Sequence, residues 1–504
     1  MSKHSGLYVV HVGSGLTLQS RAWHFTNPTT CCSLLDGKFT PESKVFSPQS
    51  PEYGPLAVYW TPAARLNPTC IFTPANAADV SRAVKLFGRK NCQFAIRSGG
   101  HSYNPGWAGI ANGILISLSN LNEVTYNPQT GLAIAGTGNR WGDVYAALAP
   151  YNITAIGGRN SDIGLGGYLT GGGISYYANK VGWAADNIKS VEIVLANGQI
   201  INADRYHHSE LFRSIKGGSS NFGIATKFVL ETVDASGPFN GIGLRYPFAS
   251  TDALLAAAYS YCTGGSDADP KSHIIFSSTI NGTQPLVNVL LMAYDGVFNA
   301  ANPPTVLKPF FDGTIPNPSF SFLTANGTSR EAAYILNLSQ KPGTRYTMGT
   351  LSIHVDYELL RTLRSIWIEE TTPDLQTASG FAAEFAFQPV GRKWLAASAA
   401  KGGNSMGIKA PLAVLWMQPR WNSASDDAAM VAYTLRVIQR FEQAAKDAGK
   451  LAKFRYLNYG NRYQDIISHY GRQDVRRLQR VKAHYDPNNV FHRLVPGGFK
   501  IPGF

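Results

Sequence analysis

A histidine set among glycines is the residue of this chain that points most directly to chemistry. His101 lies in Ser98-Gly-Gly-His-Ser102, and two further glycine-rich segments follow at 157–173 and 217–223. Glycine lets the backbone approach a ligand closely and adopt positive φ, so that neighbouring N–H groups can surround an anion. Pyrophosphate is the natural occupant of such segments, and the glycines beside His101 leave its imidazole open to a ligand. These segments together predict a dinucleotide site.

Motifs that would indicate competing chemistries are missing from the sequence. No Lys followed by Ser or Thr closes a glycine-rich segment in the manner of a nucleotide-hydrolysing loop, and H-E-x-x-H does not occur. No two cysteines form a C-x-x-C pair, so we expect no metal centre.

Regular elements are predicted on either side of the first glycine-rich segment. We expect a strand at 69–72, a helix at 74–87 with Thr73 as its N-cap, and a second strand at 93–97 that leads into the His101 segment. Further along the chain, the patterns predict the following elements: strands at 114–119, 132–136 and 224–233, helices at 140–151 and 210–216, and a hairpin at 190–202 that turns at Asn197-Gly198.

The second half of the chain has a different texture. Apolar strands are expected at 274–278, 286–292, 381–387 and 412–417, and helices at 251–262, 356–370 and 427–448. Strands and helices that alternate in this way predict a sheet covered by helices, in a layer separate from the glycine-rich unit.

Composition and charge restrict the classes of partner. Of 504 residues, 44% are hydrophobic and 15% charged, which excludes a disordered chain. The net charge of +13 suits an anionic ligand, but the basic residues are spread along the chain. The densest group is expected to be a solvated helix face rather than a nucleic-acid contact: Arg472, Arg476, Arg477, Arg480 and Lys482. No apolar run reaches the roughly 18 residues of a membrane helix, so we expect no membrane partner.

The cysteines bear on the cellular compartment. Cys31, Cys32, Cys70 and Cys92 lie in the first 92 residues, and adjacent cysteines do not easily bridge each other. One or two disulfides to Cys70 and Cys92 are expected, with the pairing open. Sequons occur at Asn152, Asn281, Asn326 and Asn337. We expect the secretory pathway, with a cytoplasmic location as the alternative because residues 6–13 make a poor signal sequence.

The motifs occur in the order found in a known flavoprotein family. Arg97-Ser-Gly-Gly-His-Ser-Tyr103 resembles the flavin-attachment motif of the berberine-bridge-enzyme-like oxidoreductases, in the vanillyl-alcohol-oxidase superfamily with its PCMH-type FAD-binding domain. The segments 157–173, 182–187 and 216–223 are similar to further flavin-contacting segments of this family. Tyr456-Leu-Asn-Tyr459 and the segment 485–491 resemble its C-terminal part. The resemblance runs from about residue 31 to the end and is greatest to fungal members.

The resemblance implies an α+β fold with a two-subdomain FAD-binding domain and an antiparallel substrate sheet covered by helices. We expect an N-terminal extension that leads into the FAD domain at 1–65, the PCMH-type FAD-binding domain at 66–237, the substrate domain at 238–450, and a C-terminal segment at 451–504 that returns to the FAD domain.

The resemblance also implies which residues hold FAD. A histidine at the position of His101 bonds covalently to the flavin in the family, and some members add a cysteine where this chain has Asn160. Covalent attachment through His101 only is therefore expected. The full set of expected cofactor contacts is Arg97, Ser98, Gly99, Gly100, His101, Ser102, Gly158, Ser161, Ile163, Gly164, Gly167, Gly171, Gly182, Asp186, Gly223, Ile224, Tyr456 and Asn458.

The resemblance leaves the proton acceptor open. The best-known member uses a glutamate on a central strand, and the corresponding strand here, at 412–418, has no carboxylate. Tyr456 is the first candidate, since it lies in a Tyr-x-Asn motif. An ordinary tyrosine, with a pKa near 10, is a poor base at neutral pH and needs a neighbouring cation or concerted hydride loss. The other candidates for the pocket wall are Tyr103, Tyr168, Tyr459 and Gln388.

The leading functional hypothesis is a monomeric flavin oxidase. A small-molecule substrate, expected to be a secondary metabolite, gives hydride to the flavin, and O2 reoxidises it to yield hydrogen peroxide. Alternatives on the same fold are a carbohydrate oxidase and a cyclase of the Diels-Alder type. A non-catalytic flavin or carbohydrate-binding protein is a third class, which the retained His101 and glycine-rich segments disfavour.

Overall fold

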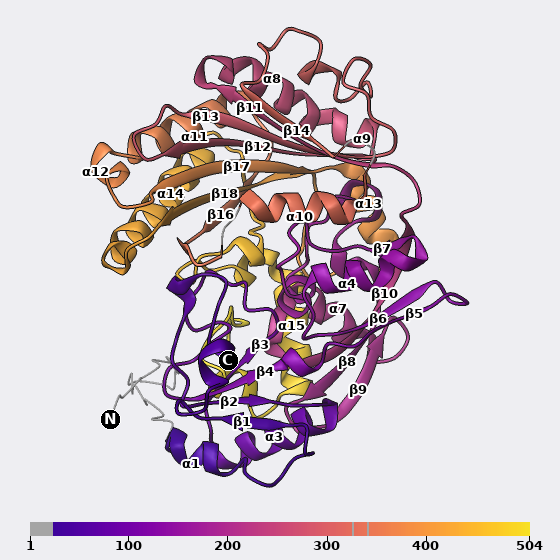
Figure 1. The fold of residues 1–504 in the computed structure, drawn as a ribbon, viewed down its shortest axis with the longest axis vertical. Helices are drawn as coiled ribbons and strands as arrows, with labels where there is room; N and C mark the ends of the chain where they lie inside the picture. Colours follow the sequence, from indigo (N-terminus) through magenta and orange to yellow (C-terminus); the bar gives the residue numbers. More distant parts are fainter. Residues whose placement is uncertain (1–23, 325–326, 340–341) are drawn as a thin grey trace, which may run out of the picture.

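The polypeptide forms two small sheets beneath one large antiparallel sheet (Figure 1). The structure is a computed structural model that describes residues 24–324, 327–339 and 342–504. Of the features expected from the sequence, the sequon Asn326 and residues 1–23 of the N-terminal extension lie outside these residues. An α+β architecture of this kind was predicted from the sequence, and it is confirmed.

The first small sheet has the strand order β1 (Lys44–Phe46), β2 (Cys70–Thr73), β4 (Ile114–Ser117) and β3 (Phe94–Arg97). β2 and β3 are both parallel to β4, so helix α3 (Ala77–Lys90) is the crossover of the predicted unit.

The predicted start of this helix was wrong. Asn76 rather than Thr73 is the N-cap, because its side chain accepts from the Asp79 N–H at 3.0 Å. Residue 75 stays outside the helix because Asn76 after it has an extended backbone, with φ −156° and ψ 172°. The Ala75 N–H donates to Ser43 Oγ at 2.8 Å. This contact comes from a segment 32 residues away, which helix propensity does not register.

Two disulfides tie the N-terminal segment to this sheet. Cys31 in α1 (Pro28–Ser33) bonds to Cys92 after α3, and Cys32 bonds to Cys70 at the start of β2. The structure thereby settles the pairing that the sequence left open, and Cys262 is a free, buried thiol.

The second small sheet holds the second and third glycine-rich segments. Its order is β5 (Val124–Asn127), β6 (Leu132–Gly136), β10 (Gly223–Asp234), β8 (Ile188–Leu195) and β9 (Ile200–Asp204), with β7 (Ile153–Ala155) also paired to β10. The 157–173 segment contains α5 (Leu165–Thr170), and α7 (Ser209–Gly218) ends at the start of the third segment. Trp141 and Trp183 are fully buried between these elements.

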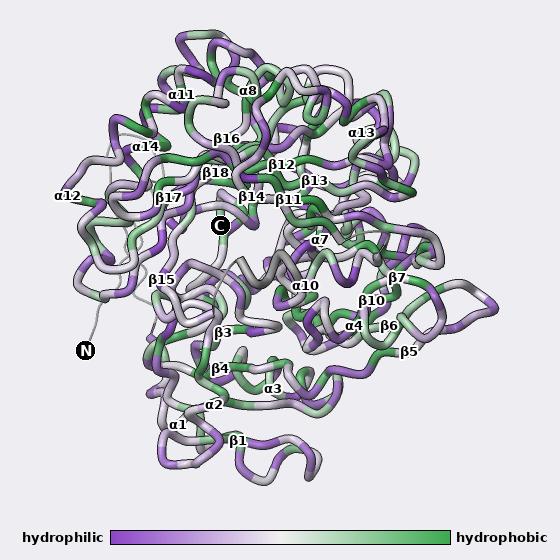
Figure 2. Tube along the Cα trace, turned by 45° about the horizontal axis from the view of Figure 1, so that its top comes forward, coloured by the Kyte–Doolittle hydropathy of each residue, from purple (hydrophilic) through white to green (hydrophobic). Residues whose placement is uncertain are grey.

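The large sheet has the order β14 (Phe320–Leu323), β11 (Phe239–Pro247), β13 (Val287–Asp295), β12 (Ser272–Asn281), β17 (Ala382–Val390), β18 (Leu412–Trp421), β16 (Gly349–Ile353) and β19 (Leu451–Ala452). A short strand, β15 (Arg345–Tyr346), pairs with β18. Helices α8 (Thr251–Ser260), α11 (Tyr357–Glu370) and α14 (Asp427–Asp447) cover its outer face (Figure 1). The strands are mostly hydrophobic and the outer helices more mixed (Figure 2).

Successive side chains along the strands of the large sheet point alternately to its outer, helix-covered face and to its inner face. Ile274 and Phe276 belong to the outer core beneath the helices, whereas Ile275 points to the other side. In β18, Leu415 and Met417 join the same outer core, and Trp416 lies opposite. This period of two decides which residues of the sheet face the glycine-rich unit.

The C-terminal tail returns to the two small sheets (Figure 1). It carries α15 (Arg472–Tyr485) and α16 (Val490–Arg493), and Phe94 N–H in β3 donates to Leu494 O at 2.9 Å. The basic cluster on α15 was predicted to be a solvated face, which is wrong for Lys482. That residue is fully buried and pairs with Asp486 at 2.9 Å, whereas Arg472, Arg476 and Arg480 are exposed. Among the described residues, no helix is long and apolar enough to cross a bilayer.

The cysteine pairing can be tested by mass. Alkylation of the denatured, unreduced protein is expected to label one thiol, that of Cys262, and reduction should release the four others. Replacing Cys32 and Cys70 by Ser should lower the free energy of unfolding by about 2–5 kcal/mol, as measured by denaturant titration. Five labelled thiols without reductant would contradict the pairing.

Candidate active site

A cavity of about 670 Å³ lies between the glycine-rich segments and the inner face of the large sheet. Both small sheets, the large sheet and the C-terminal tail contribute to its lining. Of the residues expected to contact FAD, those that line it are Ser98, Gly99, Gly100, His101, Ser102, Ile163, Gly164, Gly167, Gly223, Ile224, Tyr456 and Asn458. Segments more than 300 residues apart in the sequence therefore meet at one site.

The first and second glycine-rich segments touch directly at the base of the cavity. A Cβ added to Gly99 would lie 2.5 Å from Gly164 Cα, and one added to Gly164 would lie 2.3 Å from Gly99 N. Ser98 joins them further, because its Oγ donates to Thr137 O at 2.6 Å and accepts from Gly166 N–H at 3.0 Å. Only glycine permits backbones to approach this closely.

Other expected contacts lie behind the wall instead of lining it. These are Arg97, Gly158, Ser161, Gly171, Gly182 and Asp186. Arg97 donates to Ser117 Oγ at 3.0 Å, and Asp186 accepts from Trp183 N–H at 3.1 Å and from Asn404. These residues hold the segments in place by bonding to neighbouring elements.

His101 is held within an aromatic group at the cavity wall. Trp60 stacks on its imidazole with ring centroids 4.4 Å apart, and Tyr103 packs edge-on at 6.0 Å. Burial lowers the pKa of His101 to about 4, so the imidazole is neutral at physiological pH. Its Nε2 is buried and has no hydrogen-bond partner among the described residues. A neutral, unpartnered ring nitrogen at a cavity wall is available as a nucleophile.

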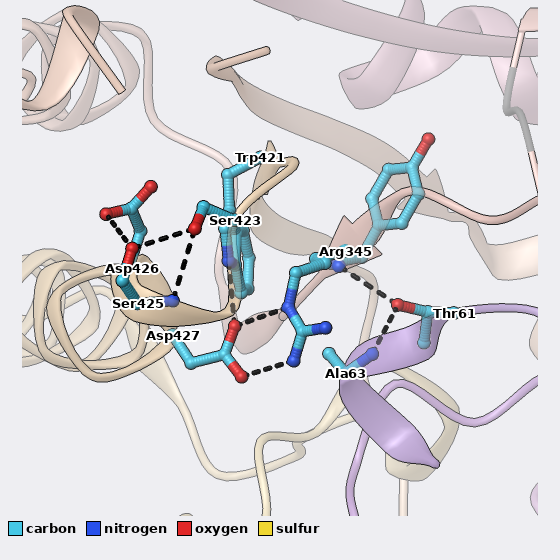
Figure 3. Close-up of polar contacts among 9 residues, drawn as sticks. Thr61, Ala63, Arg345, Trp421, Ser423, Ser425, Asp426 and Asp427 are labelled. Atoms are coloured by element: carbon cyan, nitrogen blue, oxygen red, sulfur yellow. Dashed lines mark hydrogen bonds and ion pairs between the residues drawn. The ribbon is translucent and has the colours of Figure 1, made fainter. Parts of the chain in front are cut away.

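Trp60 is a site residue that the sequence did not single out. Contacts with the segment at 343–346 hold it in place. Its carbonyl accepts from Gly343 N–H at 3.0 Å, and its ring packs on Tyr346 with centroids 4.7 Å apart. Thr61 Oγ1 accepts from Tyr346 N–H at 3.2 Å. Figure 3 shows Arg345, the neighbour of Tyr346, reaching in the opposite direction to Asp427 at the start of α14. The large sheet thus helps to position the ring that stacks on His101.

A buried guanidinium lies on the second glycine-rich segment. Arg159 donates to Gln388 Oε1 at 2.5 Å, to His273 Nε2 at 2.9 Å and to Tyr459 Oη at 2.7 Å. Burial, then Arg159 itself, holds the pKa of His273 well below its usual range, so His273 accepts as a neutral ring. All three partners are neutral groups, so none of them offsets the guanidinium charge of Arg159 beside the cavity.

Gln388 and Tyr168 were both expected in the pocket wall, and only Tyr168 lies there. Gln388 is fully buried and bonds to Arg159 without lining the cavity. Tyr168 lines the cavity, but its hydroxyl donates to Gly157 O at 2.8 Å. Each of these groups orients a neighbour.

Four further tyrosines line the cavity: Tyr103, Tyr346, Tyr456 and Tyr459. Tyr456 Oη accepts from Gly173 N–H and from Asn458 Nδ2, both at 3.1 Å. Burial raises the pKa of both Tyr103 and Tyr456, so these phenols keep their protons at neutral pH. The nearby cation Arg159 donates to Tyr459 rather than to Tyr456. Tyr456 is thus placed to donate a hydrogen bond.

The sequence also missed a carboxylate. Among the described residues that line the cavity, one has a carboxylate, and it is Glu384 on β17. It lies directly opposite Gln418 on β18, the strand in which no carboxylate was found. The signal was present, because Glu384 is an acidic residue inside a strand that was predicted to be apolar. Period-two alternation places it on the inner face.

Most of the remaining wall on the large-sheet side is apolar. Its hydrophobic residues are Leu244, Ile275, Val289, Leu291, Phe320, Phe322, Met348 and Trp416. Polar groups on this side are few, and they include Thr279, Gln418 and Arg420. A wall of this kind suits a largely hydrophobic ligand oriented by a small number of polar contacts.

Comparison with known proteins agrees with this geometry. A family model for the FAD binding domain matches residues 68–204, and the model described as berberine and berberine like matches residues 455–493. A FAD-dependent monooxygenase of Fusarium proliferatum is 32% identical over 454 residues, covering 88% of this chain and 87% of that protein.

Solved structures share the fold at lower identity. The glucooligosaccharide oxidase of Acremonium strictum superposes with a TM-score of 0.77 at 17% identity, over 95% of this chain and 99% of its own. The 6-hydroxy-D-nicotine oxidase of Arthrobacter nicotinovorans gives a TM-score of 0.75 at 20% identity, over 92% of this chain and 98% of its own. Taken with the family models and the sequence relative, these likenesses show that the chain is an FAD-dependent oxidoreductase and belongs to the berberine-bridge-enzyme-like family.

Proposed function

We propose that this protein oxidises an apolar small molecule of secondary metabolism, using FAD attached covalently through His101 alone, and that O2 reoxidises the flavin to give hydrogen peroxide. The observation that carries the proposal is that two different walls face each other across one cavity. An unpartnered, neutral His101 lies on the glycine-rich side, and a mostly hydrophobic sheet face lies opposite.

The residues present fit a bound FAD. The Gly99–Gly164 contact leaves backbone exposed where a Cβ would otherwise intrude, and Asn160 offers no thiol for a second covalent bond. When bound, FAD supplies the acceptor for a hydride from substrate carbon. Arg159 places a positive charge beside the cavity, which favours the added negative charge of a reduced cofactor. Tyr456 orients the substrate oxygen by donating a hydrogen bond.

The hydrophobic sheet face favours a secondary metabolite over a sugar. A carbohydrate needs many hydrogen-bonding groups, and burying its hydroxyls against Leu244, Ile275, Leu291 and Phe322 would leave them unsatisfied. Relatives named monooxygenases would incorporate an oxygen atom into their product instead of releasing hydrogen peroxide. Turnover under isotopically labelled dioxygen, with peroxide quantified in parallel, separates the two outcomes.

We further propose that the protein passes through the secretory pathway, because two disulfides persist in oxidising compartments. We also propose that residues 66–237 form the FAD domain and that residues 238–450 form the substrate domain. On this proposal the segment at 451–504 completes the flavin site with Tyr456 and Asn458.

Covalent attachment is tested by acid precipitation. The wild-type pellet should stay yellow, and the His101→Ala pellet should be colourless because the bonding nitrogen is gone. His484→Ala, which changes an exposed histidine, should retain the colour. A yellow His101→Ala pellet would place the attachment elsewhere.

Tyr456→Phe should leave flavin content unchanged and slow anaerobic flavin reduction. Because the phenol donates a hydrogen bond to the substrate oxygen and transfers no proton, we expect a slowing of about 2–10-fold, the size of one net hydrogen bond. The measurement is stopped-flow reduction by 2-naphthalenemethanol, an apolar aromatic alcohol. Tyr463→Phe, which alters an exposed tyrosine, is the control, and equal rates for both variants would remove Tyr456 from the mechanism.

Ile163 is predicted to control the reaction with oxygen. In the family, the residue three after the cysteine position lies beside the flavin edge that oxygen attacks, where valine accompanies oxidase activity and leucine blocks access. Isoleucine is β-branched like valine but has one more methylene, which a close-packed wall registers. Reoxidation of reduced flavin in aerated buffer should be faster in Ile163→Val and slower in Ile163→Leu. If wild type is as slow as Ile163→Leu and Val brings no gain, the protein is a dehydrogenase with another acceptor.

A further inference from the structure

Among the described residues that line the cavity, the inner face of the large sheet contributes one acidic group, Glu384, which lies in a small polar patch on a mostly apolar wall. Glu384 in β17 pairs with Thr279 in β12 on one side and with Gln418 in β18 on the other, and all three residues line the cavity. Ile275, Leu291, Met348 and Trp416 gather nearby on the same face, next to Tyr103 and Tyr459. A partly buried carboxylate that lines a cavity is a candidate functional group.

Neighbouring groups orient this carboxylate from both adjacent strands. Trp416 Nε1 donates to Glu384 Oε2 at 3.2 Å from β18, and Ser277 in β12 also hydrogen-bonds to it. Arg420 in β18 is the cation that faces Glu384, and Tyr103 is the titratable group that approaches it from the His101 segment. Burial raises the pKa of Glu384, and the two hydrogen bonds and Arg420 oppose that rise. The group is thus a stronger proton acceptor than an ordinary glutamate.

Most other polar groups of the cavity are less suited to take a proton. Tyr103 and Tyr456 have raised pKa values owing to burial, so neither is ionised at neutral pH. Tyr459, whose Oη accepts from the Arg159 guanidinium at 2.7 Å, is the competing acceptor, and an unchanged rate in Glu384→Gln would point to it. Arg159 is a cation, and His273 lies behind it, outside the cavity lining. His101 is committed to the cofactor under the proposed function.

We propose that Glu384 is the catalytic proton acceptor and that it selects apolar aromatic alcohols as substrates. The hydroxyl proton of the alcohol passes to the Glu384 carboxylate while the hydride on the same carbon passes to the bound flavin. The C–O bond becomes C=O, so the alcohol loses two electrons and two hydrogens, and O2 takes the two electrons from the flavin in the second half-reaction. The inference rests on the proposed function. It adds the substrate class and the residue that recognises the substrate hydroxyl.

The test uses two naphthalene probes and two variants of Glu384. 2-Naphthalenemethanol has the reactive hydroxyl, and its methyl ether has the same apolar body without the proton. In Glu384→Gln, which keeps the shape and the Trp416 hydrogen bond, the rate of anaerobic flavin reduction by the alcohol should fall by about 10²–10⁴-fold. Glu384→Asp should restore part of the rate. The ether, detected by its perturbation of the flavin spectrum, should bind equally to all three proteins, and Glu358→Gln, an exposed change on α11, should behave as wild type.

The pH profile separates a proton acceptor from a structural residue. In wild type the reduction rate should rise as Glu384 ionises, at a pH above the glutamate reference value near 4.3, and Glu384→Gln should lose this rise. An unchanged rate in Glu384→Gln, or the same profile in both proteins, would overturn the proposal. So would faster reduction by 2-naphthylmethylamine than by the alcohol, since Glu384 would then recognise a cation.

Failure of the proposed function gives a different result. A colourless wild-type pellet after acid would refute covalent FAD whatever Glu384 does. A yellow protein that dithionite reduces, but that 2-naphthalenemethanol does not reduce, would refute the substrate class and leave the flavin assignment intact.

Discussion

The site depends on a contact between two backbones that leaves no room for a side chain. Gly99 and Gly164 come from different glycine-rich segments and different small sheets, yet a Cβ on either would lie 2.3–2.5 Å from the other. This contact fixes where the His101 segment meets the second segment. His101, Ile163 and Arg159 then take their places around one cavity because the backbones that carry them are locked together.

The two layers of the fold contribute different chemical groups to the cavity. The glycine-rich unit offers backbone, a neutral histidine and the buried cation Arg159. The large sheet offers an apolar face with Glu384 and Gln418 at its centre. Contacts such as that of Trp60 with His101 and Tyr346 cross between the layers, so neither unit completes the site alone. The hydrogen-bond partners of Arg159 are neutral, so none of them offsets its positive charge beside the cavity.

Local rules succeeded where a single segment determines its own structure. The strand at 132–136, the Asn197-Gly198 hairpin and the helices after 251, 356 and 427 follow from alternation, turn chemistry and helical spacing. The start of α3 was misplaced because Asn76 has an extended backbone and caps the helix with its own side chain. Lys482 was expected on a solvated face, but Asp486 four residues later pairs with it in the interior.

The sequence by itself determined the family, the flavin motif around His101 and the absence of a cysteine at Asn160, because these are properties of residue type and order. Only the tertiary structure decided the disulfide pairing, the stacking of Trp60 on His101, the placement of Gln388 behind Arg159 and the entry of Glu384 into the cavity. The physical reason is that strand register sets which residues stand side by side. A carboxylate absent from β18 lies instead on β17, directly opposite Gln418, and no pattern within either strand records that neighbour.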